Sequence, residues 1–186
     1  AVITKLSIFV ILIRLCYTCF VSLSGSSWQF YSFWIGIFSV FVGSFGGLKQ
    51  RKLKTLLAYS STSHMGYSLI AFSTSTYIGV QMVLFYMIIY MISGLSIWSI
   101  FLLLKLKKNR AFAKYNKELG DFVLLKKSNP TMSFALLLTM FSIAGIPPMI
   151  GFIAKMNVFL SLVGSRFYFV ALIISIFSVL FQLFMI

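Results

Sequence analysis

Apolar residues follow one another along this chain in long, nearly uninterrupted runs. Six such runs are separated by shorter polar links. Each run is near or above the roughly 20 residues that a helix needs to cross the apolar layer of a membrane. The pattern therefore predicts an all-α fold, a polytopic transmembrane helix bundle that forms a single membrane domain over 1–186. The predicted helices cover about 1–23, 28–48, 55–73, 77–105, 131–163 and 166–186.

The polar links alternate in charge along the chain. Of the 16 lysines and arginines, four lie at 49–54 and eight lie at 105–127. The basic links thus cover 49–54 and 105–130, whereas the links after the first and third runs carry no charge. Membrane proteins keep Lys and Arg in loops on the inner side of the membrane. These links therefore predict the inner face, either cytoplasm or mitochondrial matrix, and with six crossings both termini lie on that face.

The composition indicates a membrane protein and argues against a nucleic-acid-binding protein. The chain is 60% hydrophobic and 10% charged, with a mean hydropathy of +1.02, which is typical of polytopic membrane proteins. A net charge of +14 would favour nucleic-acid binding if it covered one face, but it is concentrated in two links, so no nucleic-acid partner is expected. No targeting leader is recognisable and phenylalanine is abundant, at 21 residues, which favours a protein made inside an organelle or a bacterium.

The fifth run is too long for a straight crossing. A helix over 131–163 would extend about 50 Å, well beyond the apolar layer, unless it is tilted or broken. Adjacent prolines remove two backbone donors, and glycines flank them, so a break is predicted near 145–149. In lipid such a break persists only where protein or water covers it, and transporters use it to line ion or substrate sites. The residues that form the break are Gly145, Pro147, Pro148 and Gly151.

Lys155 follows the break and is the first candidate for a proton path. A lysine at membrane depth is costly unless it is hydrated or paired, and its ammonium can release and regain a proton. The alternative is a side chain that reaches along the helix to the membrane surface. Because eight apolar residues of the run follow Lys155, that reach would be long, and a functional role is favoured.

Two further cations lie in the first run. Lys5 precedes a run long enough to cross most of a membrane, so from the residues alone it is favoured as an anchor at the inner surface. Arg14 lies in the middle of that run and needs a partner there, because arginine stays charged. Since Glu118 and Asp121 both lie in a polar link, a partner chain supplies the acid, or Arg14 contacts carbonyls and lipid phosphate.

The third run begins with a polar stretch. His64 is the only histidine, and its near-neutral titration suits a proton relay. Ser60, Ser61 and Ser63 either support such a path or bond to the carbonyls of their own helix and serve helix packing. The two alternatives are equally favoured by the residues.

No other site chemistry is indicated. Cys16 and Cys19 form a C-x-x-C pair without a second pair or a nearby histidine, so they are expected to be buried free thiols and not metal ligands. No nucleotide-binding loop, catalytic triad or pair of carboxylates is present in the sequence. The chain is therefore expected to hold no metal, no cofactor and no catalytic residue of its own.

Two segments carry a resemblance to a known family. The first, GGLKQRKLKTLLAYSSTSHMGY, covers 46–67, and the second, SIAGIPPMIGFIAKM, covers 142–156. A basic loop followed by L-A-[YF]-S-S-x-x-H-x-G, and later by G-[IL]-P-P-x-x-G-F-x-x-K, resembles the antiporter-like subunit 2 family of respiratory complex I, the NADH:ubiquinone oxidoreductase. More weakly, ITKLSI near the start resembles the segment that carries a channel lysine in that family.

The resemblance implies a membrane-arm subunit of the respiratory chain that contributes to proton transport coupled to NADH oxidation and ubiquinone reduction. It implies that the subunit belongs to a translocating enzyme but carries no redox centre. NAD, FMN, iron–sulfur clusters and ubiquinone are then expected elsewhere in the complex. It also changes the expectation for Lys5, which becomes a channel residue, so that the implied proton path contains Lys5, His64 and Lys155.

The resemblance extends over only the last part of the family's length. Expected partners are therefore other membrane-arm subunits, lipids and a separate chain with the missing N-terminal helices, as a split gene would produce. The expected location is the mitochondrial inner membrane, crossed several times with the basic loops toward the matrix, and the gene is expected in the organelle. Two alternatives stay open: a scaffold subunit of the same complex without its own proton path, and a sodium/proton antiporter subunit.

Overall fold

A computed structural model describes residues 2–20, 27–48, 50, 52–108 and 129–185 of the 186-residue chain. Seven α-helices lie within these described residues, and no strand does. The helices are α1 (Val2–Cys19), α2 (Ser27–Gly47), α3 (Leu53–Ser73), α4 (Tyr77–Lys108), α6 (Pro130–Ala144), α7 (Ile150–Gly164) and α8 (Tyr168–Met185). The all-α expectation is confirmed, and the predicted fifth helix is two helices, α6 and α7.

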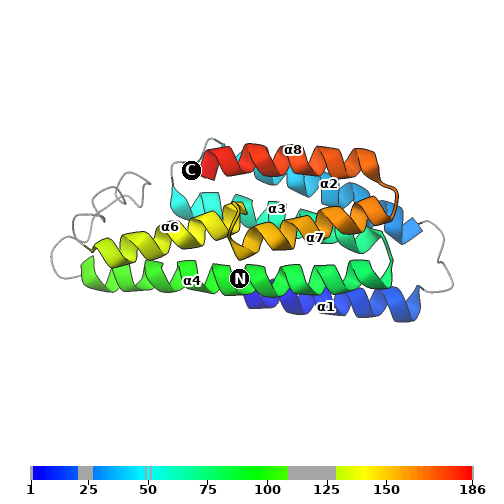
Figure 1. Cartoon of the computed structure of the whole chain (residues 1–186). Helices are drawn as coiled ribbons and strands as arrows, with labels where there is room; N and C mark the ends of the chain where they lie inside the picture. Colours follow the sequence, from blue (N-terminus) through cyan, green and yellow to red (C-terminus); the bar gives the residue numbers. More distant parts are fainter. Residues whose placement is uncertain (1, 21–26, 49, 51, 109–128, 186) are drawn as a thin grey trace.

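The helices run along one common direction (Figure 1). The long helix α4 has α1 on one side, while α6 and α7 follow one another end to end along its other side. α2 and α8 pack together on the far side of α3 and α7. The start of α3, the end of α4 and the start of α6 all lie at the left end of the bundle in this view. The two basic segments of the sequence therefore leave or enter helices at the same end.

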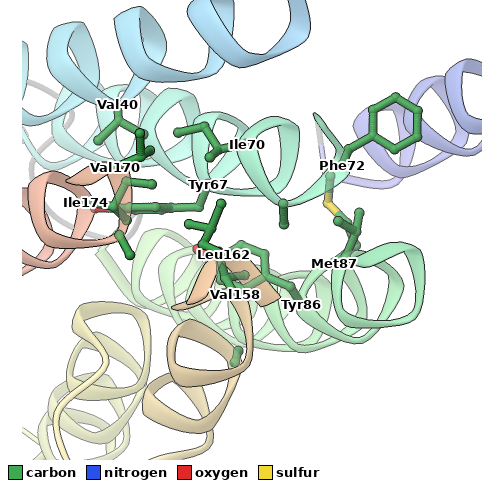
Figure 2. Close-up of a cluster of buried hydrophobic side chains, with 14 of the residues drawn as sticks. Val40, Tyr67, Ile70, Phe72, Tyr86, Met87, Val158, Leu162, Val170 and Ile174 are labelled. Carbon is green, nitrogen blue, oxygen red and sulfur yellow. The ribbon is translucent and has the colours of Figure 1, made fainter. Parts of the chain in front are cut away.

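The core lies where α3, α4, α7 and α8 meet. Figure 2 shows apolar side chains from these helices and from α2 converging on one cluster. Ile70 and Leu162 in its centre are fully buried. α1 joins the cluster through Phe9, whose ring meets that of Phe72 edge-on at 6.0 Å between centroids. The cluster thus holds the polar residues described below in fixed positions.

α2 and α3 approach closely because small residues face each other. A Cβ atom on Gly43 would lie 2.6 Å from the backbone nitrogen of Ser63, and one on Gly66 would lie 2.8 Å from the carbonyl oxygen of Gly36. Neither contact leaves room for a larger side chain. Small residues at helix interfaces allow close packing of this kind, which is common between membrane helices.

The outer faces of the bundle are apolar. Ile8 on α1, Phe38 on α2 and Leu172 on α8 are each about 60% exposed, at 63%, 63% and 58%. Within the described residues, two helical stretches have the length and composition needed to cross a membrane, Trp28–Gly47 and Tyr77–Leu102. α6 and α7 have 15 residues each, about 22 Å of helix, so neither crosses about 30 Å of hydrocarbon alone.

Candidate functional site

The break between α6 and α7 is built from the residues that the sequence singled out. α6 ends at Ala144, and Gly145 caps it in the left-handed conformation, with φ of 84°. Pro147 and Pro148 lie in the link, joined by a cis peptide bond, and are exposed. Gly151 in the first turn of α7 packs so tightly on the Ser142 carbonyl that a Cβ there would collide with it. The glycines therefore allow the tight connection, and the prolines end the helical ladder.

Lys155 reaches back from α7 into this break. Its Nζ donates a hydrogen bond of 2.5 Å to the carbonyl oxygen of Ala144, one of the carbonyls that the end of α6 leaves without a helical partner. A Cβ on Gly145 would lie 2.9 Å from Lys155 Cδ, so the glycine also leaves space for the lysine stem. The ammonium lies 5.8 Å from the centre of the Tyr67 ring. The negative end of the α6 dipole and the ring face both favour a cation at this point.

Lys5 is half-buried and does not lie at the end of the bundle. The N-terminus of α1 lies beside the middle of α4 (Figure 1). The Nζ of Lys5 donates a hydrogen bond of 2.6 Å to Ser61 Oγ on α3. Both side chains line a cavity of about 280 Å³ that extends to Lys54, near the start of α3. The cavity thus connects Lys5 with the end of the bundle where the basic links are.

His64 lies between the two lysines and is 5% exposed. Its Nδ1 forms a hydrogen bond of 2.5 Å with the Tyr86 hydroxyl, and its ring lies 4.8 Å from that of Tyr90. Its Nε2 is buried without a hydrogen-bond partner among the described residues. His64 and Lys155 both line a second, small cavity of about 10 Å³, close to the volume that one water molecule needs.

The three serines have different surroundings. Ser60 and Ser61 line the larger cavity, whereas Ser63 is buried against Gly43 of α2. All three also donate to a carbonyl three residues earlier in their own helix. Both alternatives for this stretch therefore apply, the cavity for Ser60 and Ser61 and helix packing for Ser63.

Arg14 and the two cysteines of α1 line neither cavity. Arg14 is exposed on the outside of the helix. Cys16 and Cys19 are free cysteines, but the expectation that both are buried is wrong, since Cys16 is half-buried and Cys19 is exposed. Among the residues that the structure describes, no group of three or more histidine, cysteine or acidic side chains is close enough to hold a metal ion.

Two tyrosines of the site were not predicted from the sequence. Tyr86 and Tyr90 are spaced four residues apart on α4, which places both on one helix face. Buried tyrosine hydroxyls usually find a hydrogen-bond partner, so this pair within an apolar run is a signal of a polar line inside the bundle. Lys54 was counted only as loop charge, although it lines the larger cavity.

Taken together, the site is a row of polar groups that crosses three helices. It begins at Lys54 and continues through the cavity with Lys5 and Ser61 to His64 and Lys155 at the break. Its groups can bind water and exchange protons. The site brings together Lys5, His64 and Lys155, as the implied path requires, but their roles in transport stay predictions.

Comparisons with known proteins agree on one family. The family model described as "NADH:quinone oxidoreductase/Mrp antiporter, TM" matches residues 1–181. NADH-quinone oxidoreductase subunit N of Pelagibacter ubique is 35% identical over 93% of the chain and 36% of its own length. The NADH-ubiquinone oxidoreductase chain 2 of Marchantia polymorpha is 37% identical over 79% of the chain and 29% of its own length. The chain thus spans about a third of the length of the curated relatives it matches.

A solved structure has a similar fold. A chain in the structure of the Mrp complex from Dietzia sp. DQ12-45-1b superposes with a TM-score of 0.65 and 21% sequence identity. The match covers 84% of this chain and 29% of the other. At this identity the likeness concerns the fold alone.

Proposed function

Since the chain belongs to the NADH:quinone oxidoreductase/Mrp antiporter family of transmembrane proteins, we propose that it is a membrane-arm subunit of respiratory complex I that takes part in proton translocation. The observation that carries this proposal is the position of its two inner lysines. Lys5 contacts Ser61 beside one cavity, and Lys155 contacts the open end of α6 beside another. Both amines can exchange a proton without leaving the bundle.

The broken helix provides a physical means of coupling. A continuous helix is held by its hydrogen-bond ladder, but the link between Ala144 and Ile150 has no such ladder, so α6 and α7 can shift relative to each other. Such a shift changes the contact between Lys155 and the Ala144 carbonyl. The free energy for it comes from quinone reduction in other subunits, and this chain contributes groups whose protonation changes.

The remaining components lie outside the chain. NAD, FMN, iron–sulfur clusters and ubiquinone bind to other subunits, and this chain holds none of them. The membrane is the mitochondrial inner membrane, with the basic links in the matrix, which the inner-face preference of Lys and Arg supports. The curated mitochondrial relative from Marchantia polymorpha supports the same location.

The partners are other membrane subunits and lipids. The relatives carry about two thirds of their length outside the matched region. Helices that correspond to this unmatched part pack against the outer face of α1. Arg14 on that face needs an acidic or carbonyl partner in the membrane, which such helices supply. That these helices belong to a separate chain stays a prediction. Lipid covers the apolar faces of α2 and α8, where Phe38 and Leu172 are exposed.

The test replaces Lys155 in the assembled complex. In sealed vesicles energised with NADH, Lys155→Ala is expected to lower proton translocation per NADH oxidised about tenfold or more, the scale of a lost proton-transfer group. Lys155→Arg is expected to fail as well, because arginine keeps the charge but scarcely releases a proton. The matched control is Lys52→Ala, which removes an exposed lysine outside both cavities and should translocate protons normally.

Other outcomes identify the two alternatives. If Lys155→Ala translocates protons normally in a complex with wild-type subunit content, the chain is a scaffold subunit without its own proton path. If Lys155→Arg translocates protons normally, Lys155 acts only as a fixed positive charge and does not transfer a proton. Proton movement that needs sodium and not NADH would instead indicate a sodium/proton antiporter subunit, and the description of the matching family model also names an antiporter.

A further inference from the structure

Tyr90 lies at the boundary between the two cavities of the site. It lines the larger cavity, which holds Lys5, and also the smaller one, which holds Lys155. Ile143, at the end of α6, is the other residue that both cavities share among the described part of the chain. Ile143 is 4% exposed and has no side-chain group that can carry a proton. Any transfer between the cavities therefore passes beside Tyr90.

Ser61 links Tyr90 to the Lys5 side. Ser61 and Tyr90 line the same cavity, and the side chain of Ser61 interacts with the Tyr90 hydroxyl. Ser61 Oγ accepts a hydrogen bond of 2.6 Å from Lys5 Nζ. Ser61 donates its own proton to the Ala58 carbonyl oxygen at 2.7 Å. A hydroxyl has one proton and two acceptor positions, so Ser61 can accept from Lys5 and donate to Tyr90 once its hydroxyl turns away from the Ala58 carbonyl.

The ring of Tyr90 contacts His64, on the side of the Lys155 cavity. It lies 4.8 Å from the His64 ring, at an angle of 34°. The small cavity beside it measures about 10 Å³, and a buried water needs such a volume together with two to four polar partners. Tyr90, Lys155 and His64 all line that cavity, and the Nε2 of His64 lacks a partner among the described residues. One water placed there would complete the row.

We propose that Tyr90 is the proton relay between the Lys5 cavity and the Lys155 cavity, acting through one water bound beside His64, and that Ile143 is the apolar barrier next to it. The inference rests on the proposed function, because it names the residue that joins the two inner lysines. The relay is a property of the Tyr90 hydroxyl. The ring only fixes its position.

Protons and charge balance in this relay. The Lys5 ammonium gives a proton to Ser61 Oγ, Ser61 passes its own proton to Tyr90, and Tyr90 passes its proton through the water to the amine of Lys155. Lys5 is left as a neutral amine and Lys155 becomes an ammonium, while each hydroxyl still has one proton. Before the transfer the Ser61 hydroxyl turns from the Ala58 carbonyl toward Tyr90, a rotation that hydroxyls make readily.

The test removes only the hydroxyl, with Tyr90→Phe in the assembled complex. Proton translocation per NADH oxidised is expected to fall about tenfold or more, while subunit content stays at the wild-type level. The matched control is Tyr59→Phe, since Tyr59 packs against Gly46 of α2 and lines neither cavity. That control should translocate protons normally.

A second variant separates the relay from a packing effect. Ile143→Ala shortens the apolar side chain between the two cavities, so that water can connect them directly. Combined with Tyr90→Phe, it is expected to restore part of the proton translocation. A double variant no better than Tyr90→Phe alone would overturn the relay, because a packing defect grows when a second side chain is shortened.

Lys155→Ala is measured in the same vesicles. If it impairs translocation and Tyr90→Phe does not, the relay is wrong and the proposed function stands. If Lys155→Ala itself translocates normally, the proposed function fails, and the relay fails with it.

Discussion

At the scale of single residues, Gly145 and Lys155 depend on each other. Gly145 has the φ of 84° that ends α6 in a left-handed turn, and its missing side chain leaves room for the lysine stem. The same turn leaves the Ala144 carbonyl free to accept the bond from Lys155. A cation is thus held inside an apolar bundle by backbone geometry, with no acidic side chain involved in this contact.

Gly145→Ala is expected to disturb both features. An L-residue in the left-handed region costs about 1–2 kcal/mol, and the new Cβ would lie 2.9 Å from Lys155 Cδ. The purified complex should therefore unfold at a lower temperature and translocate fewer protons per NADH. Gly164→Ala is the control, because a Cβ there meets nothing within 4 Å and Ala is the better helix former. Equal thermal unfolding of the two variants would contradict this account of the turn.

At the scale of helices, the contact between α2 and α3 holds the polar stretch of α3 in place. Gly43 allows Ser63 to pack against α2, and this sets the rotation of α3 that directs Ser61 toward Lys5. The interface relies on close backbone approach, since membrane helices gain little from apolar burial against lipid. A change at Gly43 therefore acts on the site through a helix and not through a direct contact.

Gly43→Leu is expected to separate α2 from α3 and to lower the amount of the subunit in the assembled complex. The matched control is Val42→Leu, because Val42 is 55% exposed on the outer surface. Subunit content by native gel electrophoresis measures both. Normal assembly of Gly43→Leu would mean that the two helices do not pack in this way in the complex.

At the scale of the whole molecule, the two ends of the bundle differ in charge. The start of α3, the end of α4 and the start of α6 lie at one end (Figure 1), and lysine and arginine are concentrated in the sequence next to these helix ends. The link between α3 and α4 has no charged residue. The inner-face rule therefore predicts that the basic end, toward which the larger cavity extends, lies on the inner side of the membrane.

Cysteine labelling tests this orientation. After Cys16 and Cys19 are replaced by serine, Lys52→Cys should react with an impermeant thiol reagent only from the inner side. Thr76→Cys, exposed between α3 and α4, should react only from the outer side. Reaction of both positions from one side would rule out the topology, and unaltered NADH oxidation confirms that the labelled complex is intact.

Several features of this protein follow from the sequence by itself. The apolar runs predicted the helices, and the pair Pro147 and Pro148 predicted the break, because a missing backbone donor interrupts a helix whatever packs around it. The basic links predict one inner face in the same local way, and this orientation stays a prediction. The motif resemblance also indicated the family, which the match over 1–181 confirms.

Only the tertiary structure decided which side chains meet. From the residues alone Lys5 was favoured as an anchor, but α1 begins beside the middle of α4, and Lys5 contacts Ser61 inside the bundle. The separation of Ser63 from Ser61, and the position of Tyr90 between two cavities, are also visible only in the packed helices. The physical reason is that helix length and breaks depend on residues adjacent in the chain, whereas contacts across helices depend on how packed helices are rotated and offset.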